Sequence, residues 1–294
     1  MDTTPKTTGS FESFDGTPIY YEVRGEGEPL VLVYGIACLL NHWHHQIEYF
    51  SKKYQVISFD LRGHQKSCPV ADVSQLTVDA LSKDIIGLMA HLNIRKAHFA
   101  GHSFGAPLLL DLYEKKPELF LSMVFINGFA KNPIKGMFGL DVVEPFFYFV
   151  KSQYENQPDV WNTLWKLAVD NPMSMYIAAL AGGFNLKVTH FKDIEVYARG
   201  VARMNLEVFL RLFEELMKYD GEPVLEKIEV PVLIISGEKD MVTPIRFQYH
   251  FKEKIKHSEF VLVPYGSHCT QLDFPDYTNL KIEKFLLDVK EHNI

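Results

Sequence analysis

The chain has 294 residues, of which 47% are hydrophobic, and a formal net charge of −7 at pH 7. This length and composition predict one large core with room for a subdomain, and the acidity argues against nucleic acid or an anionic membrane surface as partner. Residues 1–13 are polar, and no apolar run is long enough to span a bilayer. Three cysteines, an odd number, fit reduced thiols. We expect a cytoplasmic protein without stable membrane insertion.

Short apolar runs alternate with helical segments along the chain. A turn at Asp15-Gly16 predicts a hairpin of strands 11–14 and 18–24. Further strands are expected at 29–34, 55–59, 96–101, 123–126, 231–237 and 259–263, and helices at 76–92 and 108–115. Continuous Val, Ile and Leu runs are typical of parallel strands covered on both faces. The predicted fold class is α/β, a mostly parallel doubly wound sheet.

Residues 130–229 have a different pattern, with aromatic and apolar residues at helical spacing and no clear strand. We expect a helical cap over 130–229, inserted after the sixth strand at 123–126, and a core formed by 1–129 and 230–294. Most of the aromatic and methionine side chains are expected to join the cap to the sheet, and a few to line an apolar pocket. The candidates are Phe146, Phe147, Tyr148, Phe149, Trp161, Trp165, Met173, Met175 and Tyr176.

Ser103 lies between two glycines in the segment Gly101-His102-Ser103-Phe104-Gly105. A strand that turns sharply into a helix presents a serine in a strained conformation, which requires glycine two residues away on either side. The following helix leaves the backbone N–H of Phe104 free to donate to an oxyanion. The segment predicts a nucleophilic serine, although glycine and serine also form ordinary strand-to-helix turns.

A nucleophilic serine needs a base and an acid that orients the base, and candidates for both follow strand ends. His268 comes after the apolar run 259–263, and Asp240 comes after the buried strand at 231–237. In open α/β sheets, ligands bind where such loops meet the strand ends. The order Ser103, Asp240, His268 is that of α/β hydrolases.

The chain resembles the α/β-hydrolase fold family over nearly its whole length, in the capped branch of carboxylesterases, C–C bond hydrolases and cofactor-free haloperoxidases. Besides the segment around Ser103, the resemblance rests on Tyr34-Gly35-Ile36, residues 60–67, residues 237–244 and Gly266-Ser267-His268. It implies Ser103 as nucleophile, His268 as base and Asp240 as orienting acid. It also implies an oxyanion hole formed by the backbone N–H groups of Ile36 and Phe104.

Two residues depart from the pattern of this family. Tyr34 stands where the family usually has a histidine that organises the oxyanion loop. Gln65 replaces a glycine that allows a tight turn, so we expect strain or a different loop path there. Neither departure removes a catalytic group.

Other acidic residues and histidines compete for roles in the site. Asp273 and Asp276 would have to fold back to reach His268, and the family's other position for the acid holds Asn127, so Asp240 is preferred. The histidines at 42, 44 and 45 are not on one helical face and lack an evident fourth ligand. We therefore expect no metal site and no cofactor, and we interpret His102 as a packing residue.

The sequence predicts a serine hydrolase that cleaves a small or medium carboxylic ester through an acyl-enzyme, with a small apolar ester or acyl compound as substrate. A C–C bond hydrolase or cofactor-free haloperoxidase would use the same triad. Cap arginines at 199, 203 and 211 would serve a C–C hydrolase, but their spacing favours a solvated face. A receptor or regulator for small ligands is the non-catalytic alternative. Acyl transfer and a homodimer are left open.

Overall fold

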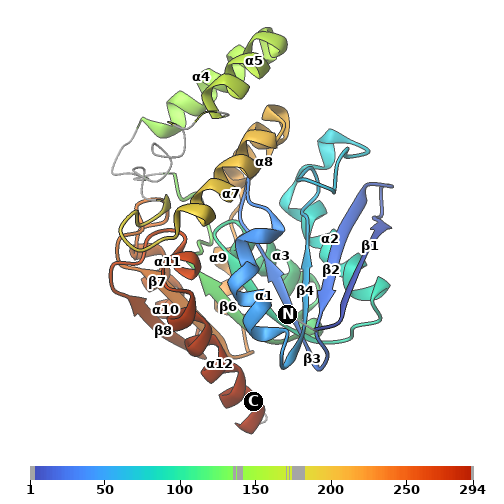
Figure 1. Cartoon of the computed structure of the whole chain (residues 1–294), viewed down its shortest axis with the longest axis vertical. Coiled ribbons are helices and arrows are strands. Elements are labelled where there is room, and N and C mark those ends of the chain that lie inside the picture. The colour runs from blue at the N-terminus through green and yellow to red at the C-terminus, as the bar shows by residue number, and fades with distance from the viewer. Residues whose placement is uncertain are drawn as a thin grey trace.

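An eight-stranded sheet forms the centre of the computed structural model, which describes residues 4–134, 137, 142–169, 171, 173 and 183–292 (Figure 1). The strand order is β1-β2-β4-β3-β5-β6-β7-β8. The strands are β1 (Lys6–Glu12), β2 (Pro18–Arg24), β3 (Glu28–Val33), β4 (Tyr54–Phe59), β5 (Ala97–His102), β6 (Phe120–Ile126), β7 (Val232–Gly237) and β8 (Ser258–Val263). Strand β2 is antiparallel to β1 and β4, and the other neighbours are parallel. The predicted fold class is confirmed.

Helices cover both faces of this sheet. The helices outside the β6–β7 connection are α1 (His44–Phe50), α2 (Val78–His91), α3 (Gly105–Lys115), α10 (Arg246–Lys254), α11 (Thr270–Asp273) and α12 (Pro275–His292), with short 3₁₀ turns at Leu40–Trp43, Val73–Gln75 and Pro117–Leu119. Helices α2 and α3 pack against each other, as do α1 and α12, and both α3 and α12 contact β6.

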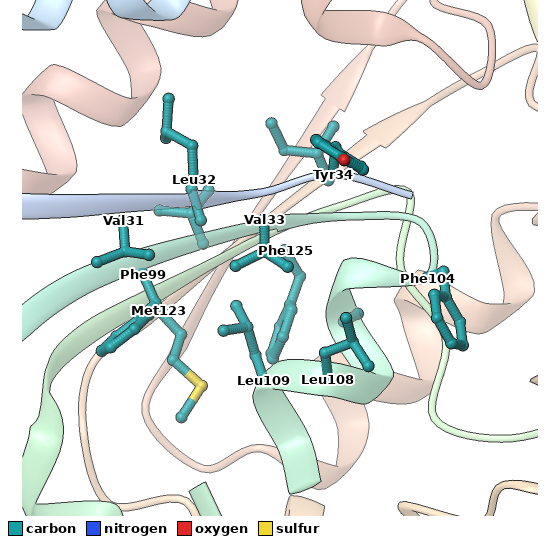
Figure 2. Packing of buried hydrophobic residues seen from close by; sticks show 14 of the residues in the cluster. Val31, Leu32, Val33, Tyr34, Phe99, Phe104, Leu108, Leu109, Met123 and Phe125 are labelled. Atoms are coloured by element: carbon teal, nitrogen blue, oxygen red, sulfur yellow. The ribbon is translucent and has the colours of Figure 1, made fainter. Parts of the chain in front are cut away.

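Strand β3 shows why the central strands read as continuous apolar runs. Val31 and Val33 point toward α3, whereas Leu32 and Tyr34 point to the opposite face (Figure 2). All four are almost completely buried, because helices cover both sides. A strand buried on both faces has no polar side to alternate with its apolar one.

The first strand is placed differently from our prediction of residues 11–14. Strand β1 spans Lys6–Glu12, and the turn begins earlier, where the Ser13 N–H donates to Thr17 O over 2.9 Å. The Asp15 carboxylate accepts from the Thr17 N–H, and Gly16 takes a φ of +83°. The prediction failed because β1 is an exposed, largely polar edge strand with little apolar pattern.

A buried arginine fastens this hairpin to the rest of the core. Arg62 is fully buried, and its guanidinium donates two bonds of 2.6 Å to the Asp84 carboxylate on α2. A third N–H donates over 2.8 Å to Asp15 in the hairpin turn. The planar guanidinium suits such bidentate pairing, so this arginine is structural.

Between β6 and β7, the described part of the chain is helical. These inserted helices are α4 (Val143–Asn156), α5 (Pro158–Val169), α7 (Phe191–Arg203), α8 (Leu206–Lys218) and α9 (Glu222–Leu225). Helices α4 and α5 project from one end of the molecule, with α8 between them and the sheet (Figure 1). Across the described residues, no helix combines the length and apolar character that a membrane span requires.

Candidate active site

Ser103 occupies a sharp turn between β5 and α3. Its φ is +53°, in the left-handed region that non-glycine residues seldom adopt, and its N–H donates to Ile126 O over 3.0 Å. A Cβ at Gly105 would lie 2.4 Å from Val33 O, and one at Gly101 would lie 3.0 Å from the backbone of Gly105. Both flanking glycines are therefore required by close backbone approach, as the sequence predicted.

Ile36 and Phe104 line the cavity that contains Ser103. Within the described chain, neither of their backbone N–H groups donates to a protein acceptor. A Cβ at Gly35 would lie 3.0 Å from the Cβ of Ser103, so the loop that carries Ile36 approaches the serine closely. The two predicted oxyanion donors therefore lie in one cavity with the predicted nucleophile.

Tyr34 and His64 hold this loop. The Tyr34 hydroxyl donates to Asp60 over 3.1 Å and accepts from the Leu61 N–H over 2.9 Å. The Ala37 N–H donates to His64 Nε2 over 3.2 Å, and His64 Nδ1 lies 3.2 Å from the Arg62 carbonyl oxygen. Burial lowers the pKa of His64 to about 4, so a neutral ring donates from Nδ1 and accepts at Nε2. The tyrosine that departs from the family's pattern is thus part of a hydrogen-bonded support.

Asp240 and His268 meet where the loops after β7 and β8 come together. His268 Nδ1 lies 2.9 Å from Asp240 Oδ2, and both side chains are buried. The Asp240 carboxylate also accepts from the N–H groups of Val242 and Thr243, over 2.8 and 2.9 Å, and from the Thr243 hydroxyl over 2.7 Å. These donors fix the carboxylate so that it orients the imidazole.

The competing acids have other positions. Asp273 accepts from the Ser267 N–H over 2.6 Å and from the N–H of Asn185 and the hydroxyl of Thr189, so it organises the loop beside His268. Asp276 lies in the first turn of α12. Of the three acids considered, Asp240 is the one placed at His268 Nδ1.

Asn127 joins the loops that carry Asp240 and His268, a role that its sequence context did not reveal. Its side-chain NH₂ donates to the carbonyl oxygens of Ser267 and His268, over 3.0 and 2.6 Å. Its side-chain oxygen accepts from the Gly237 N–H at the end of β7, over 2.8 Å. The residue has a φ of +49°, which asparagine tolerates better than most residues. An asparagine directly after a buried strand was the signal available in the sequence.

His102 also supports His268, in addition to packing beside the serine turn. Its Nε2 lies 2.9 Å from the carbonyl oxygen of His268, so this nitrogen donates and Nδ1 accepts. Its Nδ1 lies 3.2 Å from His42 Nε2, and the Gln271 side chain contacts the same His42 nitrogen. Burial lowers the pKa of His42 to about 3 and that of His102 well below its usual range, which keeps both rings neutral.

Two groups of side chains have atoms close enough together to share a metal ion. One is Cys38, His42 and His102, which are buried, and the other is His44, His45 and Asp193, with the atoms of each group within 4.8 Å of one another. In the first group both His102 nitrogens already take part in hydrogen bonds, and burial raises the pKa of the Cys38 thiol to about 12. In the second group, the Nε2 atoms of His44 and His45 lie 3.3 and 3.1 Å from the carboxylate of Asp193.

The cavity that holds Ser103 and His268 has a volume of about 290 Å³. Its wall is otherwise largely apolar and aromatic, with contributions from α7, α8 and Trp165 of α5. Of the aromatic and methionine candidates in 130–229 that are described, Trp165 lines this cavity. Met175 and Tyr176 lie outside the described residues. The arrangement places a hydroxyl, an imidazole and two free N–H groups in one apolar chamber.

The chain belongs to the α/β-hydrolase fold family, whose model matches residues 28–275. It is 25% identical over 276 residues to the (E)-2-((N-methylformamido)methylene)succinate hydrolase of Acinetobacter baylyi, covering 92% of this chain and 94% of that protein. It is 26% identical over 269 residues to 3-oxoadipate enol-lactonase 2 of the same organism, covering 90% and 91%. A thermophilic esterase from Thermogutta terrifontis superposes with a TM-score of 0.78 at 19% identity, covering 96% and 99%.

Proposed function

We propose that this protein is a serine hydrolase that cleaves carboxylic esters through an acyl-enzyme. Membership of a hydrolase family supports hydrolysis as the reaction class. The observation that carries the ester proposal is the cavity itself, whose largely apolar wall includes Ser103, His268 and the two residues with unengaged N–H groups, Ile36 and Phe104. The described wall residues include no lysine or arginine, which favours an uncharged acyl group.

The proposed reaction assigns one role to each group. His268 takes the proton of Ser103 as the serine oxygen attacks the ester carbonyl, while Asp240 stabilises the imidazolium through Nδ1. The N–H groups of Ile36 and Phe104 stabilise the tetrahedral oxyanion. The imidazolium then protonates the departing alcohol, and water activated by the same histidine hydrolyses the acyl-enzyme.

The wall of the cavity separates this proposal from C–C bond hydrolysis of a substrate that carries a carboxylate. Arg211 forms an ion pair of 3.0 Å with Glu207, one turn earlier on α8. Arg203 borders a different, surface pocket rather than the cavity of Ser103. A carboxylate in the cavity would therefore lack a cationic partner among the described wall residues, at a substantial desolvation cost.

The test compares the wild-type protein with Ser103→Ala on p-nitrophenyl butanoate. We expect steady turnover by the wild type and a loss of at least about a thousandfold in kcat in the variant, with an unchanged circular dichroism spectrum. Ser74→Ala is a matched control in an exposed turn and should retain full activity. Equal turnover by wild type and Ser103→Ala would refute the assignment, and one burst without turnover would favour a ligand receptor.

A further inference from the structure

A second apolar cavity, of about 390 Å³, lies between α4, α5 and α8. All twelve residues that line it are aliphatic or aromatic. We call this cavity the distal groove. The wall has no charged, hydroxyl or amide side chain, and its polar side-chain groups are the indole N–H groups of Trp161 and Trp165, of which that of Trp165 already donates to Met204 O. The chemistry of the distal groove therefore favours hydrocarbon.

The distal groove and the cavity of Ser103 share a wall. Trp165, Phe209 and Phe213 line both. Their rings contact one another in sequence, with centroids 5.1 Å apart for the tilted pair Trp165 and Phe209 and 5.4 Å apart for the stacked pair Phe209 and Phe213. The Trp165 indole donates to Met204 O over 3.1 Å, which holds the first ring in place. The two cavities therefore adjoin at these rings, and an acyl chain that passes from one to the other meets apolar surface in both.

The distal groove leaves apolar side chains exposed when it is empty. Phe146 on α4 is 66% exposed and Leu164 on α5 is 47% exposed, although both line the groove. Exposed apolar surface that is contiguous with a binding cavity is a common mark of a ligand site. Hydrocarbon placed here would remove these side chains from water, which is favourable in proportion to the area covered.

We propose that the distal groove binds the far end of the substrate's acyl chain, so that the enzyme prefers esters of unbranched fatty acids longer than the first cavity alone can hold. This inference rests on the proposed ester hydrolysis and specifies its substrate class. The carbonyl lies at Ser103, the first carbons lie in the cavity of about 290 Å³, and the later carbons follow the shared rings into the groove.

The experiment measures kcat/KM on p-nitrophenyl acetate, butanoate, octanoate and decanoate below their aggregation concentrations. In the wild type we expect kcat/KM to rise from butanoate to decanoate, by up to about fourfold for each buried methylene. Ala168→Phe places a ring in the distal groove from an exposed position on α5. It should lower kcat/KM for decanoate at least about tenfold and change the value for acetate less than about twofold. Leu167→Phe, at the neighbouring exposed position outside the groove, is the matched control.

The outcomes separate this inference from the proposed function. Hydrolysis of acetate and butanoate with a flat or falling profile toward decanoate refutes the distal subsite and leaves ester hydrolysis intact. An equal effect of Ala168→Phe and Leu167→Phe also refutes it. If no ester is turned over, the proposed function fails. Binding is then tested with methyl decanoate and methyl butanoate on the Ser103→Ala protein, through the fluorescence of Trp161 and Trp165 in the groove. A response to decanoate that Ala168→Phe abolishes supports the site, and no response overturns it.

Discussion

The loops at the carboxyl ends of the strands, here called the sheet edge, and the inserted helices contribute to the site by opposite physical means. At the edge, buried polar side chains are hydrogen-bonded to backbone groups of the loops that form the site, as Asn127, His102 and Asp240 show. In the helices, the surfaces that face the cavities are apolar, and Trp165 and Phe209 meet through their rings. Hydrogen bonds have direction and therefore fix the positions of reacting groups, whereas apolar contacts accept ligands of different length. The comparison predicts that changes at the edge affect kcat and changes in the helices affect KM.

The largest expected effect among these tests is at the edge. Asn127→Asp keeps the acceptor for the Gly237 N–H but replaces the donor to the Ser267 and His268 carbonyls by a negatively charged oxygen. We expect kcat to fall about a hundredfold, with KM changed less than about threefold, because His268 loses its fixed position. Steady-state kinetics on p-nitrophenyl butanoate provide the measurement.

A second asparagine controls for this substitution. Asn93 also has a positive φ, of +56°, and is exposed after α2. Asn93→Asp should leave both kinetic constants unchanged. A kcat for Asn127→Asp within about twofold of the wild-type value would show that the edge does not depend on this residue.

Acid should destabilise the fold through its buried neutral histidines. In the folded protein the pKa of His42 is about 3, that of His64 is about 4, and that of His102 is well below the usual 6.5. As the pH falls below 6.5, the unfolded chain therefore binds more protons than the folded protein does. The free energy of unfolding therefore decreases with acid, by about 2 kcal/mol at pH 5 for each of His42 and His64, and His102 acts in the same direction. The pKa of Asp60 is raised from 3.8 to about 6, so protonation of this carboxyl stabilises the fold as the pH falls from 6 toward 3.8 and opposes the trend.

Urea denaturation at pH 7 and pH 5 measures this effect. We expect a lower midpoint at pH 5 with a similar slope, because the buried neutral histidines outweigh the carboxyls whose pKa is raised, Asp60, Asp84 and Glu215. In His64→Gln the decrease between the two pH values should shrink by about 2 kcal/mol. Identical midpoints for the wild type at both pH values would contradict the assignment of neutral buried rings.

The smallest expected effect concerns the attachment of α7. Asp193 lies 3.3 and 3.1 Å from the Nε2 atoms of His44 and His45, which belong to α1. Asp193→Ala should lower the free energy of unfolding by less than about 1 kcal/mol, because the histidines are partly exposed. Since Tyr197 and Val201 of α7 line the cavity, KM should rise about threefold while kcat stays constant.

Asp288→Ala on α12, which removes an exposed ion pair with Lys284, is the control for this variant. It should change neither kinetic constant. A decrease in kcat with constant KM for Asp193→Ala would reverse the proposed division between edge and helices.

The parts of the molecule that were predictable from sequence are those with a local cause. Gly101 and Gly105 mark the serine turn because a Cβ at Gly105 would collide with Val33 O and a Cβ at Gly101 would crowd the backbone of Gly105. The buried strands were recognisable from their continuous apolar runs, with ends within a few residues of those observed. Asp240 and His268 could be named because each follows such a strand directly, and the structure places them together.

The contacts made by supporting residues depend on distant parts of the chain. His102 meets a carbonyl 166 positions later, and His64 supports a loop 27 positions earlier. Such pairs have no local pattern, so His102 was expected only to pack. Gln65 was expected to carry strain, and its φ of +39° agrees with this, but its bond of 3.3 Å to Gly200 O on α7 could not be anticipated.

The segment that precedes α7 is tied directly to the loop of the proposed base. The Cys269 N–H and the Ser267 hydroxyl both donate to Gly183 O over 3.1 Å, and the Asn185 side chain donates to Tyr265 O over 2.8 Å. Passage of substrate or product through this segment would break hydrogen bonds that each contribute about 1 kcal/mol to stability. The same movement would disturb the loop that carries His268, so chemistry and access cannot be changed independently on this side of the site.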